Sequence, residues 1–269
     1  MQNATFFLDQ TQYNWLATQL PKPVSATGRP ATANNELLNG VLFVLKTGCR
    51  WQDIPSSVCS HSYSSCWRRL HYWQECGALQ LVWQQLLVLL AEQGKLDLSL
   101  GNLDGTLVQS PRFEATGYSG KHRRFGTNLS LVTDKYGMPL AGLLTAGNRH
   151  DQYSAAATLI KLRVSGNNKI AMLNADKGYD STPFRSYLSD QGIVANIPER
   201  VYVKKQRRPD YRPPDYDKSL GRFRTYVERT NAWLKYFRKL RYRWECTRTM
   251  FQAFVDLACL LICLRRVEF

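Results

Sequence analysis

The stretch RFRTYVERTNAWLKYFRKLRYR, residues 222–243, decides what the rest of the chain must build. We predict one amphipathic helix there, because two sets of residues recur at helical spacing. Four share a stripe that can face a core: Phe223, Val227, Thr230 and Leu234. Four share an adjacent arc of about 60°: Arg224, Glu228, Asn231 and Lys235. In this arrangement the Glu228 carboxylate could hold a metal while the neighbouring cations bind an anionic polymer. The alternative is a solvated helix with i,i+4 ion pairs.

The charge is concentrated around that stretch. The chain of 269 residues has a formal net charge of +15 and 44% hydrophobic residues, as expected of a globular protein with one large domain or two modest ones. Residues 201–250 hold 15 Lys or Arg and 5 Asp or Glu, so 15 − 5 = +10 of the total lies there, among tyrosines and tryptophans. This mixture predicts nucleic-acid binding. It does not favour a membrane surface, because the apolar face is needed for a core.

The cysteines indicate the compartment. There are seven, an odd number with no CxxC pair, which predicts free thiols and a reducing compartment. Four lie near two histidines: Cys49, Cys59, Cys66 and Cys76, with His61 and His71. Their spacing matches no common zinc template, so buried thiols are favoured and a zinc site is the alternative. The first residues show no signal-peptide pattern, and no apolar run approaches the roughly 20 residues of a membrane span.

The first 95 residues predict a small all-helical domain. Apolar spacing indicates four helices, over 6–20, over 32–46, from 60 or 62 onward, and over 79–92. Asp9 or Thr11 could cap the first of them. The third combines aromatic core positions with exposed serines and arginines, which is typical of a helix-turn-helix-like module. Arg68 and Arg69 would then face a DNA groove. The alternative is a plain helical bundle with a basic surface.

Residues 96–269 predict an α/β domain with a mixed sheet flanked by helices. Strands are expected over 98–108, 128–133, 138–145, 169–174 and 193–197, and helices over 154–162, 182–191 and 250–266. Two polar loops are expected, over 112–127 and 198–220. The first carries three candidate DNA contacts, Lys121, Arg123 and Arg124.

Two acids lie at or near the ends of predicted strands, which can bring them together at one edge of a sheet. Asp104 lies in or at the end of an apolar strand, and Asp176 directly follows the strand KIAMLN. With Glu228 they would form three carboxylates that repel one another unless a cation is present. Oxygen ligands of this kind suit Mg²⁺ or Mn²⁺, which supports phosphoryl transfer. The alternative for each acid alone is a turn or cap residue.

Several blocks together resemble DDE transposases of the bacterial insertion-sequence group called IS-five, within the IS-four superfamily. The three catalytic blocks are similar to DGT at 104–106, ADKGYDS at 175–181 and VERTNAWLKYFRKLRYR at 227–243. The group's DNA-binding module resembles LLNGVLFVLKTGCRWQDIP at 37–55 with YSSCWRRLHYWQECGALQLVW at 63–83. A further strand block resembles GMPLAGLLTAGNRHD at 137–151. The resemblance extends from about residue 8 to residue 266.

The resemblance implies an RNase H-like catalytic fold and a Mg²⁺-dependent DNA endonuclease and strand transferase. Asp104, Asp176 and Glu228 would be the catalytic and metal-binding triad, with Mn²⁺ a possible substitute. The superfamily signature Tyr-x2-Arg-x3-Glu-x6-Lys fits Arg224, Glu228 and Lys235, whereas Gly221 replaces the tyrosine that contacts phosphate. The pair His150-Asp151 also matches the group, with either a site role or a loop role. Basic neighbours complete the expected DNA contacts: Arg224, Arg229, Lys235, Arg238 and Lys239.

The expected function follows from this resemblance. The protein would bind the inverted terminal repeats of its insertion sequence as a homodimer on double-stranded DNA, hydrolyse the ends and join the 3′-OH groups to target DNA. It would act in the bacterial cytoplasm on the nucleoid, without a membrane partner. The alternatives are a repurposed DNA-binding protein that does not cleave and a zinc-dependent regulator.

Overall fold

The computed structural model describes residues 8–24, 31–162, 169–199 and 216–269. The predicted start of the first helix and most of the predicted loop over 198–220 lie outside the described residues. The first half contains four helices and a short 3₁₀ turn: α1 (Gln10–Gln19), α2 (Asn34–Thr47), η1 (Trp51–Asp53), α3 (Tyr63–Glu75) and α4 (Ala78–Glu92).

In the described part of the second half there are six strands, with helices between and after them. The strands are β1 (Leu100–Gln109), β2 (Gly117–Ser119), β3 (Arg124–Thr133), β4 (Pro139–Ala146), β5 (Met172–Asn174) and β6 (Val194–Asn196). The helices are α5 (Asp151–Ile160), η2 (Lys177–Tyr179), α6 (Thr182–Asp190), α7 (Lys218–Gly221), α8 (Arg224–Tyr236), α9 (Arg238–Arg241) and α10 (Arg248–Leu264).

The four N-terminal helices confirm the predicted all-helical region, and their ends follow local chemistry. The Asp9 carboxylate accepts the Gln12 backbone N–H at 2.8 Å and so caps α1. Gly48 ends α2 in the left-handed conformation, with φ of 70°, where its N–H donates to the Val44 carbonyl oxygen. Ser62 precedes α3, as the sequence predicted.

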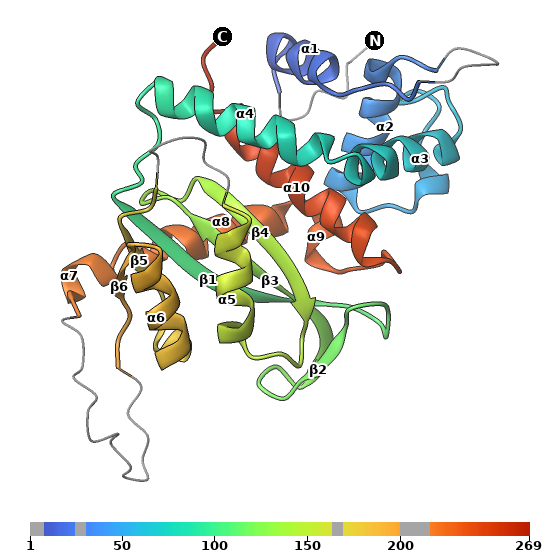
Figure 1. Ribbon diagram of the computed structural model, residues 1–269. Coiled ribbons are helices and arrows are strands. Elements are labelled where there is room, and N and C mark those ends of the chain that lie inside the picture. Colours follow the sequence, from blue (N-terminus) through green and yellow to red (C-terminus); the bar gives the residue numbers. More distant parts are fainter. Residues whose placement is uncertain (1–7, 25–30, 163–168, 200–215) are drawn as a thin grey trace.

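The sheet confirms the predicted RNase H-like fold class. Its strand order is β4-β3-β1-β5-β6, with the short β2 pairing the beginning of β3. β3 is antiparallel to both β1 and β4, whereas β5 and β6 run parallel to β1. Three antiparallel strands followed by two parallel ones in this order define the RNase H-like topology. In Figure 1, α5 lies in front of the sheet and α8 lies behind it.

The last helix joins the two halves of the molecule. α10 packs against α3 and α4 on one side and against β4 on the other, as Figure 1 shows. Nearly all its side chains are buried, in one continuous core that also includes α4 and the sheet. The domain boundary expected between residues 95 and 96 lies in the connection from α4 to β1, and it stays a prediction. Among the described residues, no helix is both long and apolar enough to cross a membrane.

The prediction of one helix over 222–243 was wrong. α8 ends at Tyr236, because Phe237 adopts an extended conformation, with ψ of 106°, and buries its ring. The short α9 follows, and Tyr242 then pairs with Gln109 of β1 in an isolated bridge. Arg243, the next residue, is completely buried, and its guanidinium donates to the Thr127 hydroxyl at 2.6 Å. Burying these side chains outweighs the continuous helical periodicity.

Other element boundaries also differ from the prediction. The expected loop over 112–127 contains β2 and the start of β3, because residues 117–119 pair with residues 124–126. α5 begins three residues earlier than predicted, where the His150 imidazole accepts the Gln152 N–H. Residues 218–221 form α7, since the Asp217 carboxylate caps them by accepting the Ser219 N–H at 2.7 Å.

Candidate active site

Asp104 lies in the middle of β1 and points toward α8. The Asn231 side-chain amide of α8 donates to Asp104 Oδ2 at 3.0 Å. Burial raises the pKa of the Asp104 carboxyl group above its usual value; Arg224 opposes this rise and Glu228 adds to it. The Asp104 carboxylate is therefore close enough to both α8 side chains to interact with their charges.

Arg224 links the other two predicted acids. Its Nη1 lies 3.7 Å from Asp176 Oδ1, and its Nη2 lies 3.9 Å from Glu228 Oε1, one helical turn away. Asp176 follows β5 and caps η2 by accepting the Lys177 N–H at 2.7 Å. The structure thus brings Asp104, Asp176 and Glu228 around one guanidinium, which provides the positive charge that three neighbouring carboxylates need.

Lys235 approaches the same site from about two turns further along α8 than Glu228. Its ammonium group donates to the Thr106 hydroxyl at 2.6 Å, two residues after Asp104 on β1. Burial lowers the pKa of Lys235, and the Asp104 charge partly offsets this effect. Both cations of the predicted signature, Arg224 and Lys235, therefore border the acids.

The donor chemistry of the site fits a divalent cation. Within the described ranges, no three His, Cys, Asp or Glu side chains already converge tightly enough to enclose a metal. However, Asn231 Oδ1, whose amide nitrogen binds Asp104, is a buried acceptor without a hydrogen-bond partner. A cation or its bound water beside Asp104 would satisfy that oxygen. The other two carboxylates, Asp176 and Glu228, are half-exposed and border the same guanidinium, so a cation can reach them from solvent.

Gly105 shows why a glycine follows Asp104. A Cβ atom there would lie 2.9 Å from Asp151 Oδ1 and 3.2 Å from the Tyr179 hydroxyl oxygen. Asp151 accepts the Asn128 amide at 2.5 Å, so it is fixed by β3. The Tyr179 hydroxyl is buried without a partner, and burial followed by the nearby Asp151 charge raises its pKa well above the usual value. Acidic and phenolic groups therefore pack closely behind the Asp104 strand.

Gly221, which departs from the family signature, lies against another tyrosine. The Tyr216 hydroxyl group, at the end of a side chain that can rotate, occupies the space that a Cβ atom at position 221 would enter. A different tyrosine thus approaches the first position of the signature.

Four residues near the site were not among the predicted functional residues: Asn231, Thr106, Tyr179 and Tyr216. Asn231 shares the predicted arc of Glu228, and Thr106 and Tyr179 belong to the quoted blocks, so the sequence placed them nearby without giving them a role. Only the spatial contact with Gly221 identifies Tyr216.

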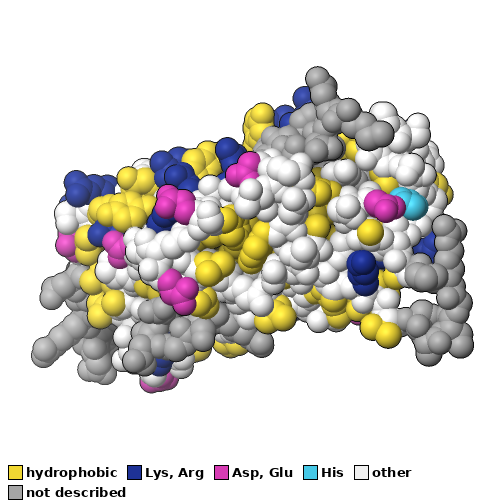
Figure 2. Space-filling model, turned by 90° about the horizontal axis from the view of Figure 1, so that it is seen from above, with side chains coloured by type: hydrophobic (Ala, Val, Ile, Leu, Met, Phe, Trp, Pro, Cys, Tyr) yellow, Lys and Arg dark blue, Asp and Glu magenta, His cyan; other side chains and the backbone are white. Residues whose placement is uncertain are grey.

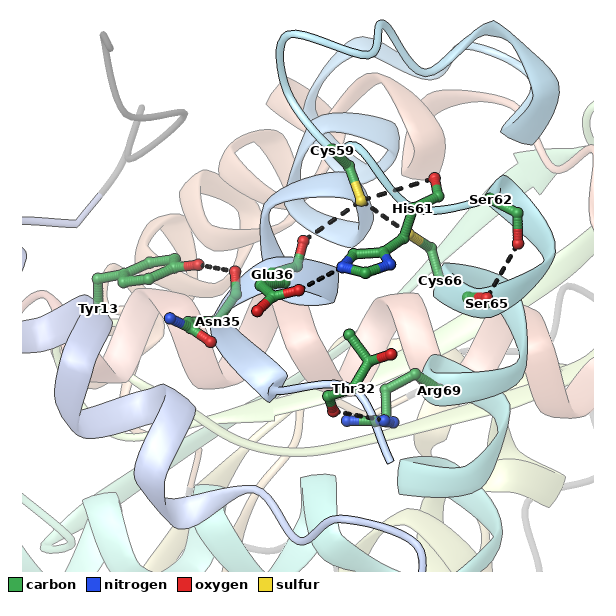
Figure 3. A network of polar contacts seen from close by, with 10 residues as sticks. All are labelled: Tyr13, Thr32, Asn35, Glu36, Cys59, His61, Ser62, Ser65, Cys66 and Arg69. Carbon is green, nitrogen blue, oxygen red and sulfur yellow. Dashed lines mark hydrogen bonds and ion pairs between the residues drawn. The ribbon is translucent and has the colours of Figure 1, made fainter. Parts of the chain in front are cut away.

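Two predicted DNA contacts were wrong. Arg69 is buried, where its guanidinium donates to the Asn34 side chain and to the Thr32 carbonyl oxygen, as Figure 3 shows for Thr32. Lys239 is also buried and lies 2.7 Å from Glu245 Oε1. Since both cations are satisfied inside the protein, neither is available to a phosphate.

The other predicted contacts are accessible but lie in different places. Arg68 is exposed on α3, and Arg238 is exposed at the start of α9. Lys121, Arg123 and Arg124 are exposed at the turn between β2 and β3. Burial lowers the pKa of His122 in this turn, and the charges of Asp151 and Lys235 also influence it, so the turn lies within electrostatic reach of those two side chains.

Arg229 lies on a different face of α8 from Glu228. Its guanidinium stacks on Tyr226 and Trp233, 4.6 and 4.8 Å from the ring centres, and donates to the Tyr136 carbonyl oxygen at 3.0 Å. These side chains line an open cavity of about 600 Å³ that Lys95, Arg265 and Arg266 also border. Figure 2 shows basic and hydrophobic side chains gathered along one edge of the molecule.

The alternative zinc site is not assembled. The Cys59 and Cys66 sulfur atoms lie 3.6 Å apart, but His61 turns to Glu36, as Figure 3 shows. Cys49 and Cys76 contribute to no group of three metal-ligating side chains among the residues that the structure describes. Burial raises the pKa of the Cys66 thiol to about 12, as expected of an inert buried cysteine.

Comparison with known families gives two matches that together span most of the chain. Residues 96–263 match the family described as "Transposase DDE domain", and residues 8–86 match "Putative transposase of IS4/5 family".

Two relatives and one solved structure illustrate the similarity. The chain is 36% identical over 154 residues to the "Putative transposase for insertion sequence element IS402" of Burkholderia cepacia, covering 54% of this chain and 67% of that protein. It is 31% identical over 139 residues to the corresponding IS6501 protein of Brucella ovis, covering 52% and 98%. The crystal structure of the Mos1 strand transfer complex is 14% identical, with a TM-score of 0.29, covering 92% of this chain and 82% of that one.

Proposed function

The chain belongs to the DDE-domain transposases of the IS4/5 family, and from this premise we propose that it moves its own insertion sequence by cutting and joining DNA. Residues 1–95 bind the inverted terminal repeats, and residues 96–269 hydrolyse a phosphodiester at each element end. The freed 3′-OH then attacks target DNA. The gathering of Asp104, Asp176 and Glu228 around Arg224 at the sheet carries this proposal.

The three acids would hold a divalent cation, which is Mg²⁺ or, as a substitute, Mn²⁺. When bound, such a metal lowers the pKa of a water molecule and neutralises charge on the phosphate. Asn231 orients the Asp104 carboxylate through its amide hydrogen bond. Arg224 and Lys235 lie beside the acids, where they can bind the phosphates next to the scissile bond.

Other exposed cations extend the DNA contact beyond the acids. The β2–β3 turn carries Lys121, Arg123 and Arg124 near the site, and Arg68 presents a separate positive charge on α3. Two element ends must be held together for transposition, so the active species is a homodimer on double-stranded DNA. Such a protein would act on the bacterial nucleoid, in the cytoplasm.

A cleavage assay tests the proposal on a duplex that carries the inverted repeats flanking the gene. Asp104→Asn, Asp176→Asn and Glu228→Gln should each lower the Mg²⁺-dependent rate by more than about 100-fold, the upper range for lost support around a metal. Asp190→Asn, an exposed acid at the end of α6, serves as the matched control. Wild-type cleavage by any of the three variants contradicts the assignment. Repeat binding by the wild type without any cleavage favours the non-cleaving alternative.

A further inference from the structure

Three buried asparagines form a row across neighbouring strands. Asn102 on β1 pairs in register with Asn174 on β5, and Asn174 pairs with Asn196 on β6. Their side chains are at most 2% exposed. A row of amides inside a sheet costs free energy unless every polar atom finds a partner.

The asparagine ladder, as we call Asn102, Asn174 and Asn196, satisfies this requirement. The Asn196 amide donates to Asn174 Oδ1 at 2.7 Å, and the Asn174 amide donates to Asn102 Oδ1 at 3.1 Å. The Asn102 amide continues the chain to the Asp134 carbonyl oxygen at 2.9 Å, in the turn between β3 and β4. None of these side-chain atoms is a buried polar atom without a partner.

One side of the ladder fixes the segment that leads into α8. The Asn174 amide also donates to the Leu220 carbonyl oxygen at 2.8 Å. The Asn196 side chain both donates to the Asp217 carbonyl oxygen and accepts the Asp217 N–H, at 3.1 and 2.9 Å. α7 and its capping residue, which directly precede α8, are therefore attached to the parallel strands by side-chain amides.

The other end of the ladder reaches α8 through a turn. Asn102 binds the turn that begins at Asp134, and the Thr230 hydroxyl of α8 donates to Gly137 in that turn at 2.6 Å. The ladder is thus linked to the α7–α8 segment on both sides of Glu228 in sequence. The link before Glu228 is direct, at Leu220, and the link after it passes through the β3–β4 turn to Thr230.

The same asparagines are related to the two aspartates by equal spacing. Asp104 comes two residues after Asn102, and Asp176 comes two residues after Asn174. In extended chain, two residues advance about 6.6 Å and return to the same face. The register that the ladder sets between β1 and β5 therefore sets the offset between Asp104 and Asp176.

We propose that Asn102, Asn174 and Asn196 are positioning residues that fix the backbone positions from which Asp104, Asp176 and Glu228 can reach one divalent cation, an inference that rests on the proposed function. β5 and β6 have only three residues each, so few backbone hydrogen bonds define their register. Apolar side chains would pack in several registers, whereas this amide row is satisfied in one. The ladder therefore provides the register specificity that such short strands lack.

The first experiment measures hydrogen exchange of side-chain amides in the free, ¹⁵N-labelled protein. The amide protons of the ladder should exchange at least about 100-fold more slowly than those of the exposed Asn35, because they are buried and hydrogen-bonded. Exchange as fast as that of Asn35 overturns the ladder. This measurement needs no variant to fold and no DNA.

The second experiment measures Mn²⁺ binding to the free protein by calorimetry. Asn174→Leu should weaken binding by about 10-fold or more, the range for lost support around a metal ligand. Thr158→Val, which removes a buried hydroxyl that donates to Ser130 at 2.8 Å, is the matched control and should stay within about twofold. Asn174→Asp keeps the shape but removes the amide donors, and it replaces Asn174→Leu if that variant does not fold.

The outcomes separate the two proposals. If Asp176→Asn abolishes Mn²⁺ binding while Asn174→Leu binds as tightly as Thr158→Val, the ladder has no positioning role and the proposed function stands. If Asp176→Asn leaves binding unchanged, the proposed metal site fails, and the positioning role fails with it. Weakened binding in both Asn174→Leu and Asp176→Asn, with Thr158→Val unaffected, supports both.

Discussion

Replacing Lys239 should destabilise the protein rather than weaken its hold on DNA. Lys239 and Glu245 form an ion pair at 2.7 Å, with side chains only 4% and 10% exposed. The Lys239 ammonium also lies 5.5 Å from the centre of the Phe254 ring of α10. In Lys239→Met the thioether can pack on that ring, but the Glu245 carboxylate loses its buried partner.

The expected loss is large because a buried charge is left unpaired. Breaking such a pair from one side costs about 3–5 kcal/mol, whereas replacing both partners by apolar groups is often neutral. A chain of this size loses roughly 2–4 °C in Tm per kcal/mol. Lys239→Met should therefore melt about 6–20 °C below the wild type, and the double variant with Glu245→Met should recover most of that loss.

Urea unfolding followed by tryptophan fluorescence measures these free energies, and a double-mutant cycle isolates the pair. DNA affinity is then measured at a temperature where every variant is folded. Arg238→Ala, an exposed neighbour, is the control and should change stability by less than about 0.5 kcal/mol. A cost below about 1 kcal/mol for Lys239→Met, or DNA affinity that falls while stability stays unchanged, would refute the reasoning.

Four further predictions follow from the described contacts. Arg69→Ala should lower the free energy of unfolding by about 1–3 kcal/mol, because Asn34 and the Thr32 carbonyl lose a charged donor. Arg68→Ala should change only DNA affinity. Thermal melts measure the first effect and gel shifts measure the second. Gly105→Ala should cost about 1–3 kcal/mol in urea unfolding, since its Cβ would displace Asp151 and Tyr179, and equal stability would contradict this packing. Burial raises the pKa of the Asp256 carboxyl group, so the protonated group stabilises the fold at low pH and this contribution is lost as pH rises through the raised pKa. Asp256→Asn should not show this loss, and stabilities of wild type and variant that change in parallel with pH would contradict the prediction. Tyr216 lies against Gly221, where the family signature has a tyrosine that contacts phosphate, so Tyr216→Phe should slow DNA cleavage about 10-fold, the value of one hydrogen bond to a charged group, with unchanged stability; an unchanged rate would show that the Tyr216 hydroxyl does not contact phosphate.

The sequence predicted the layers of the fold well because they follow from short-range patterns. Helical periodicity located α2, α3 and α4 to within a few residues, and apolar runs located the longer strands. Spacing within α8 placed Arg224, Glu228 and Lys235 on one face, as the structure shows. What periodicity could not show is the end of α8 at Tyr236, because burial of Phe237 is a tertiary effect.

The site was less predictable where neighbours on one element have opposite environments. Arg68 and Arg69 are adjacent in sequence but about 100° apart on a helix, so one is exposed and the other is buried. Composition alone treats them as equals. Tyr216 and the asparagine ladder depend on strand register and on chain segments far apart in sequence, which no local pattern encodes.

The position of α10 has a consequence for how the protein is made. α3 and α4 bury their apolar faces against a helix that begins 156 residues after α4 ends, by the difference between residues 92 and 248. At about 5–20 residues per second, a ribosome needs roughly 8–30 s to supply it. During that time the N-terminal helices lack part of their core, so we expect the nascent chain to need chaperone protection until α10 emerges.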